Sequence, residues 1–114
     1  MNYESLSQEI NVLHAEICSA LGDQSRLLIL YALNEKPKNV SDLANELGLN
    51  QPAVSRHLNL LRARGLVIAR REGQSVVNTL ADHRVIEALD LLRAVLAAKL
   101  GNQATLAKSV NGKH

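Results

Sequence analysis

The sequence predicts a mainly α-helical domain that carries one small β-hairpin. Three observations lead to this prediction. Apolar residues recur every three or four positions along most of the chain, which is the spacing of an amphipathic helix. The chain has no Phe or Trp and only two Tyr, so its core must consist of Leu, Val, Ile and Ala. A short stretch after Gly65 is instead rich in β-branched residues around a glycine, which is typical of a hairpin.

The first two helices are predicted on either side of Gly22. Between Glu4 and Leu21 the apolar residues are spaced four, three and four apart, which gives the stripe Leu6, Ile10, Leu13 and Ile17. Gly22 ends this helix, and Asp23 can cap the next one. The second helix is expected to be buried because it is apolar nearly all round, with Leu27, Leu28, Leu30, Tyr31 and Leu33.

A short helix and a tight turn follow a polar loop at residues 34–39. Ser41 is the predicted cap of this helix, which spans Asp42–Leu47. Gly48 comes directly after it and supplies the left-handed residue that commonly ends a helix. The turn from Gly48 to Asn50 leads into a longer helix.

The longer helix has a predicted cap, Asn50, and a glycine stop, Gly65. Its buried stripe follows the i, i+4, i+7 spacing at Val54, Leu58 and Leu61. Two helices joined by a three- or four-residue turn that contains glycine form a helix-turn-helix motif, in which the second helix enters the major groove of DNA.

A hairpin and a final helix complete the predicted fold. The two strands, Leu66–Arg71 and Gln74–Leu80, flank a turn at Glu72 and Gly73. The last helix is expected to begin near Asp82 and to end at about residue 100, with one broad apolar face. Residues 1–100 should therefore form one domain, and residues 101–114 a loose polar tail.

Positive charge is concentrated in one segment of the chain. Residues 50–71 contain five arginines and no acid, whereas the remaining residues include 8 basic and 11 acidic ones. A basic segment of this kind is the electrostatic footprint of a protein that meets DNA phosphates. The alternative is an ordinary solvated helix face, which is what most charge runs are.

Composition also argues against several classes of protein. The single cysteine, Cys18, cannot form an internal disulfide and suits a reducing cytoplasm. No apolar run approaches the ~20 residues of a membrane span, so we expect a cytoplasmic protein without a membrane partner. There is no glycine-rich phosphate loop, no nucleophile–base pair and no paired carboxylates, so we expect neither an enzyme nor a cofactor.

Four motifs, in this order, resemble the ArsR/SmtB family of winged-helix repressors. They are LGDQSRLLIL at 21–30, VSDLA at 40–44, QPAVSRHL at 51–58 and GLV followed by REG within 65–73, and the match covers about residues 10–100. The resemblance implies the element order α-α-α-α-β-β-α and a homodimer through the first and last helices. It also implies binding to an inverted-repeat operator, from which a chemical signal releases the repressor.

The resemblance and the physics of helix-turn-helix proteins give the same candidate DNA contacts. The first turns of the recognition helix reach base edges, where Gln51 can pair with adenine and Arg56 can contact guanine or the backbone. Phosphate contacts, which set affinity rather than sequence, are expected further along the helix and on the hairpin. The full set is Asn50, Gln51, Ser55, Arg56, His57, Asn59, Arg62, Arg70, Arg71 and Gln74. For His57 the alternative is a structural hydrogen-bonding role.

The apolar stripes of the first and last helices predict a homodimer. A lone chain of this length would leave much of both stripes in water, and pairing across a two-fold axis buries them. Pairing also sets two recognition helices about one DNA turn (~34 Å) apart. The candidate interface is Leu6, Ile10, Leu13, Leu89, Leu92, Val95 and Leu96. The alternative is that these stripes cover only their own domain.

The two metal sites common in this family are missing from the sequence. At the start of the third helix, metal sensors of this family have a motif that resembles Cys-Val-Cys-Asp. The matching residues here are Asn39-Val40-Ser41-Asp42, which contain no thiolate. On the last helix Asp82 is present, but Arg84, Val95 and Ala98 fill the other matching positions and cannot complete a tetrahedral zinc site.

His14 and Cys18, four residues apart on the first helix, are the remaining sensor candidates. They could form half a metal site completed across a dimer, or Cys18 could be a redox-sensitive thiol. The alternative is a buried cysteine that packs as a small hydrophobe. Sensing could instead use a small organic inducer, or be absent.

The sequence therefore predicts a dimeric, sequence-specific DNA-binding regulator, most simply a repressor of double-stranded operator DNA. The alternative is a winged-helix module that binds an acidic protein partner, or an anti-repressor that does not bind DNA itself.

Overall fold

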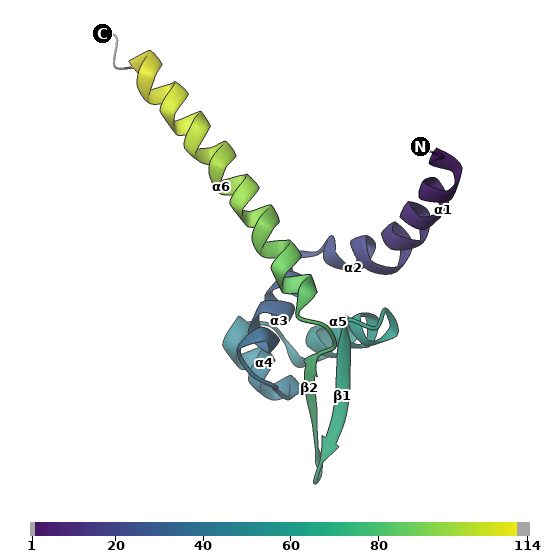
Figure 1. Ribbon diagram of the computed structural model, residues 1–114. Helices are drawn as coiled ribbons and strands as arrows, with labels where there is room; N and C mark the ends of the chain where they lie inside the picture. The colour runs from purple at the N-terminus through teal and green to yellow at the C-terminus, as the bar shows by residue number, and fades with distance from the viewer. Residues whose placement is uncertain (1, 112–114) are drawn as a thin grey trace. The chain divides into compact units, whose positions relative to one another are not determined.

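The computed structural model describes residues 2–111, and the side chains of residues 2–102. Figure 1 shows its elements, which follow the order α1 (Tyr3–Leu13), the π-helical turn η1 (His14–Cys18), α2 (Ser19–Leu21), α3 (Gln24–Glu35), α4 (Val40–Leu47), α5 (Gln51–Ala63), β1 (Val67–Glu72), β2 (Ser75–Leu80) and α6 (Arg84–Asn111). The predicted fold class, mainly α with one antiparallel hairpin, is confirmed. The chain divides into two compact units, Met1–His83 and Arg84–His114.

A widened turn interrupts the first predicted helix without ending it. The segments α1, η1 and α2 follow one another directly, and the Ser19 N–H donates to the His14 carbonyl five residues earlier. Asn2 caps the start of α1, where its side-chain oxygen accepts from the Glu4 N–H. A π-helical turn within an α-helix is rare and often found near functional positions.

The core of the first unit is aliphatic, as the composition predicts. The predicted stripe of α5, Val54, Leu58 and Leu61, is fully buried. It is buried together with the apolar side of α3, where Ile29 and Leu30 are also inaccessible to solvent. The expectation that α3 is buried all round is wrong on one side, because Leu28 is 42% exposed.

The caps of α4 and α5 fix the helix-turn-helix. Asn50 caps α5 as predicted, because its Oδ1 accepts from the Ala53 N–H at 2.8 Å. Gly48 ends α4 in the left-handed conformation with φ 68°, also as predicted. The predicted cap Ser41 is wrong. Asn39 caps α4 instead, accepting from the Asp42 N–H at 2.8 Å, and the helix begins at residue 40.

The hairpin, or wing, turns one residue later than predicted. Glu72 pairs with Ser75, so the two-residue loop consists of Gly73 and Gln74 rather than Glu72 and Gly73. Gly73 has φ 64° and Gln74 does not have a positive φ, which is the pattern of a type II′ turn. The register shifts because this turn needs glycine in its first position.

The last helix is longer than predicted. We expected it to end near residue 100, but α6 continues to Asn111, so residues 101–111 are not a loose tail. A single glycine at position 101 costs a helix only about 1 kcal/mol, which the following Ala, Leu and Lys residues offset. The end of the expected tail, residues 112–114, lies outside the described residues. Among the described helices, none combines the length and apolarity that crossing a membrane requires.

Candidate nucleic-acid interface

The recognition helix α5 exposes polar side chains outside its buried stripe. Gln51, Arg56 and Asn59 are exposed, and Ser55 is half-buried. The side-chain oxygen of Asn50 is occupied by its cap hydrogen bond. The start of α5 therefore presents donors and acceptors of the kinds that read base edges.

The wing carries Arg70, Arg71 and Gln74, all exposed. Pairing places Arg70 opposite Val77 and Arg71 opposite Val76, so the two arginines lie on opposite faces of the hairpin. Val76 lines an open depression next to the recognition helix, whereas Val77 lines a different recess with Arg70. Arg71 is thus the arginine on the recognition-helix side of the wing.

This depression lies where the starts of α4 and α5 meet the tip of the wing. Its lining combines five polar residues with two valines and consists of Asn39, Val40, Ser41, Gln51, Gln74, Ser75 and Val76. Gln51 crosses from α5 to α4, because its Nε2 donates to the Ser41 Oγ at 2.9 Å. Three elements of the helix-turn-helix and wing therefore face one surface hollow.

Arg62 holds the end of α5 to the wing. Its Nη1 donates to the Asn78 Oδ1 on β2 at 3.2 Å, and its Nη2 donates to the Asn59 Oδ1. The sequence predicted a phosphate contact for this arginine. Arg62 is half-buried, and its guanidinium makes these two hydrogen bonds within the protein.

Asn78 is fully buried and anchors the wing to the loop before α4. Its backbone N–H and carbonyl pair with the carbonyl and N–H of Lys38 at 2.8 and 3.0 Å. Its Nδ2 also donates to the Lys38 carbonyl at 3.3 Å. The side chain thus bonds the loop through its nitrogen and Arg62 through its oxygen, which satisfies both ends of a buried amide.

The Lys38 ammonium is also buried, with 2% of its side chain exposed. Its Nζ donates to Glu46 on α4 at 2.7 Å and to Glu35 at the end of α3 at 3.2 Å. The hydrogen bond to Glu46, with a smaller contribution from Glu35, raises the pKa of Lys38 despite its burial. Sequence patterns gave no sign of this buried cation.

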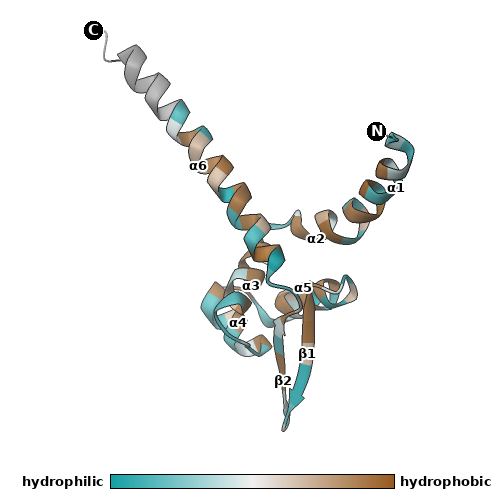
Figure 2. Cartoon of the chain, in the orientation of Figure 1, coloured by the Kyte–Doolittle hydropathy of each residue, from teal (hydrophilic) through white to brown (hydrophobic). Residues whose placement is uncertain are grey.

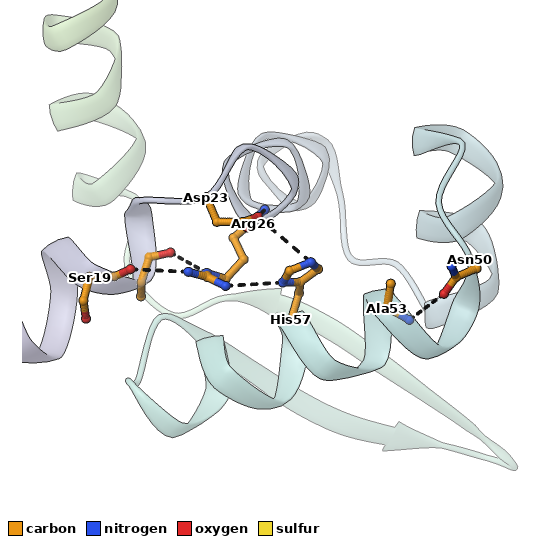
Figure 3. A network of polar contacts seen from close by, with 7 residues as sticks. Ser19, Asp23, Arg26, Asn50, Ala53 and His57 are labelled. Atoms are coloured by element: carbon orange, nitrogen blue, oxygen red, sulfur yellow. Dashed lines mark hydrogen bonds and ion pairs between the residues drawn. The ribbon is translucent and has the colours of Figure 1, made fainter.

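His57 connects the recognition helix to the start of α3 (Figure 3). Its Nδ1 lies 3.4 Å from an Arg26 guanidinium nitrogen, and its Nε2 lies 4.0 Å from the Asp23 Oδ1. Arg26 continues the network, donating to the carbonyls of Ala20 at 2.7 Å and Ser19 at 3.3 Å. These contacts are those of a structural hydrogen-bonding residue.

Arg64 makes a second connection between α5 and the N-terminal helical segment. Its Nη1 donates to the Ala15 carbonyl at 2.6 Å and lies 3.6 Å from the Glu16 Oε2. Of the five arginines in residues 50–71, Arg62 and Arg64 are therefore committed to internal contacts. Arg56, Arg70 and Arg71 remain exposed.

Apolar side chains of α1 and α6 remain exposed in the single chain. Figure 2 marks the hydrophobic positions of these two helices as brown bands on the ribbon. Five of the seven predicted interface residues are large and exposed, namely Ile10, Leu13, Leu92, Val95 and Leu96. Leu6 is half-buried, and Leu89 is only 7% exposed. The sequence missed other exposed apolar residues on the same helices, Tyr3, Val12, Leu91 and Leu100.

His14 and Cys18 are the first and last residues of the π-helical turn η1, and both are exposed. Within the single chain, Cys18 does not pack as a buried small hydrophobe. Within residues 2–111, no three His, Cys, Asp or Glu side chains gather closely enough to hold a metal ion.

A helix-turn-helix whose second helix exposes polar side chains, followed by a hairpin with exposed arginines, defines a winged helix-turn-helix protein. The family model described as "Bacterial regulatory protein, arsR family" matches residues 23–69. The transcriptional regulator CmtR of Mycobacterium bovis is 37% identical over 100 residues, which are 87% of this chain and 85% of CmtR. The chain therefore belongs to the ArsR family of bacterial regulatory proteins, which are transcriptional regulators rather than enzymes.

Two further comparisons agree with this assignment. The transcriptional regulator NmtR of Mycobacterium tuberculosis is 45% identical over 76 residues, and the match spans 67% of this chain and 63% of NmtR. The homodimeric winged helix-turn-helix DNA-binding domain of Mb0332 from Mycobacterium bovis superposes with a TM-score of 0.72 at 27% identity, covering 90% of this chain and 92% of that one.

Replacing Asn78 with Ala should lower the free energy of unfolding by about 1–3 kcal/mol, because the Lys38 loop and Arg62 both lose a buried partner. Urea denaturation at neutral pH measures this change. The matched control is Asn59→Ala, which removes the exposed partner of the same arginine and should change stability by less than about 0.5 kcal/mol. Equal losses in the two variants would contradict the anchoring role of Asn78.

Asp23 should make the protein sensitive to acid. The Arg26 backbone N–H, helped by the charges of Arg26 and His57, holds the pKa of the Asp23 carboxyl below its ordinary value of 3.8. The carboxylate therefore stabilises the fold above about pH 4, and this contribution is lost as pH falls through the lower, folded-state pKa.

Asp23→Asn keeps the cap acceptor but cannot titrate, so its unfolding free energy should fall less steeply with acid than that of the unmodified protein. Denaturation curves between pH 6 and pH 2 measure the two slopes. Asp42→Asn removes one exposed carboxylate from α4 as the control for net charge. Parallel curves for Asp23→Asn and the unmodified protein would disprove the assignment.

Proposed function

We propose that this chain is a homodimeric repressor that binds an inverted-repeat operator and leaves it in response to a chemical signal. The observation that carries the proposal is the surface formed by the start of α5 and the wing. There Gln51 lines an open depression together with Gln74 and Val76 of the wing, and Arg71, which pairs with Val76, is exposed. Base-reading groups next to phosphate-neutralising groups are what a sequence-specific DNA contact needs.

The exposed apolar sides of α1 and α6 support the dimer. Leu92, Val95 and Leu96 each expose more than half of their surface in the single chain. Burying such residues against a second copy is favourable by roughly 25 cal/mol for each Å² of apolar surface. The homodimeric state of Mb0332 supports the same assembly. A two-fold pair of recognition helices fits an operator with two inverted half-sites.

The signal proposed here is not a metal held at the family's two common sites. In the first of these, Asn39 caps α4 and Ser41 bonds Gln51, so both side chains already serve the helix-turn-helix. The second retains Asp82 alone of its matching positions. The signal is instead a small inducer that binds the dimer or a reaction at the exposed Cys18. A screen for release from DNA with organic effectors, peroxide and persulfide distinguishes the two.

DNA binding should depend steeply on salt. Counterion release lowers log K by roughly 0.9 per neutralised phosphate for each unit of log salt. Arg71→Ala should weaken binding to all sequences alike and reduce this slope by about 1, and Arg70→Ala should reduce it less because Arg70 lies on the other face of the wing. Fluorescence anisotropy titrations at KCl concentrations from about 50 to about 300 mM measure the salt slope of each variant.

Binding that is absent or independent of salt would contradict the proposed function and favour the alternative of a protein-binding module. Equal slopes for Arg70→Ala and Arg71→Ala would leave DNA binding intact and contradict the orientation assigned to the wing.

Leu92→Glu should convert the dimer to a monomer, because it places two charges in an apolar interface. Sedimentation equilibrium should give twice the chain mass of 12.4 kDa for the unmodified protein and the chain mass itself for the variant. Ile68→Glu is the matched control, since it changes an equally apolar, half-exposed residue on the wing and should leave the dimer intact. A monomeric unmodified protein at micromolar concentration would contradict the dimer.

A further inference from the structure

The hydroxyl of Ser41 has no role in capping α4, although its position in the sequence is that of a cap. Asn39 supplies the cap by accepting from the Asp42 N–H. Ser41 is exposed, and its Oγ accepts a hydrogen bond from the Gln51 Nε2 at 2.9 Å. The bond joins the first turn of α4 to the first residue of α5, across the turn of the helix-turn-helix.

The chemistry of the glutamine amide gives this bond a consequence. The amide has two N–H donors and one carbonyl acceptor. A bidentate contact with adenine uses one N–H, toward N7, and the carbonyl, toward the N6 amino group. Ser41 accepts from the amide nitrogen and uses one of its two N–H groups, which leaves one N–H and the carbonyl for a base. The hydrogen bond within the protein and the contact with the base therefore use different parts of the same group.

The bond also restricts the rotation of the Gln51 amide before DNA arrives. An exposed glutamine normally rotates about three side-chain bonds, and a contact that requires one orientation must freeze that rotation. Both side chains line the open depression between α4, α5 and the wing tip, so the held amide remains accessible. Fixing a flexible side chain in advance removes part of the cost of binding.

We propose that Ser41 is a positioning residue that sets the sequence specificity of Gln51. This inference rests on the proposed DNA-binding function and goes beyond it. Ser41 itself reads no base. It holds the Gln51 amide in the orientation in which the amide can both accept and donate a hydrogen bond at one base edge. Loss of the Ser41 hydroxyl should therefore affect the choice of base rather than the general attraction to DNA.

The test is selection from a random 24-bp duplex library, followed by affinities for the best selected duplex and for its single base-pair variants. The unmodified protein should select a motif with one strongly preferred base pair, and Gln51→Ala should lose the preference at that position. Ser41→Ala should reduce discrimination at that same base pair by about 2- to 10-fold, the effect of freeing one side chain, and leave affinity for random DNA unchanged. Ser41→Thr keeps the hydroxyl and should restore discrimination.

A double-mutant comparison separates positioning from a merely structural role. In a Gln51→Ala background, Ser41→Ala should have no further effect, because the group that it positions is gone. The matched control, Ser7→Ala on α1, removes an exposed serine and should change neither motif nor affinity. Thermal unfolding of Ser41→Ala should match that of the unmodified protein, since the cap of α4 is intact.

Three other outcomes would contradict either the proposed function or the role of Ser41. If the unmodified protein selects no motif, the proposed function fails and this inference fails with it. If it selects a motif that Ser41→Ala leaves unchanged, DNA binding stands and the role of Ser41 is disproved. If Ser41→Ala weakens all sequences equally, or acts fully in the Gln51→Ala background, Ser41 contacts DNA or supports the fold and does not position Gln51.

Discussion

One buried amide, Asn78, connects the wing to the helix-turn-helix. A fully buried asparagine is costly unless all of its polar atoms have partners, and here it bonds Lys38 on one side and Arg62 on the other. The wing therefore has a fixed attachment to both the loop before α4 and the end of α5. The side chain adds to the buried Val67 and Leu80 at the base of the hairpin, whose other side chains are mostly exposed.

Features of the fold that depend on neighbouring residues could be predicted from the sequence. The stripe of α5, its cap at Asn50 and the glycine at position 48 follow from spacing and local backbone preference. The errors arose where two local solutions are nearly equal in energy. Asn39 and Ser41 are both good caps, and packing decides which is used. Gly101 alone was too weak a signal to end α6.

The candidate site was harder to predict, because charge is visible in a sequence and its partners are not. The sequence identified the basic segment but could not say which arginines are exposed. Arg62 reaches Asn78, which lies 16 residues away, and Arg64 reaches Ala15, which lies 49 residues away. The buried ammonium of Lys38 depends in the same way on Glu46 and on the bridge to β2. Such pairs form only once the chain has folded, so no local sequence pattern predicts them.

The several attachments of α5 have a mechanical consequence. Gln51 is tied to α4, His57 to α3, Arg62 to the wing and Arg64 to the π-helical turn, so restraints run from the first turn of the helix to its end. The helix therefore cannot slide or rotate by itself without breaking several of these bonds.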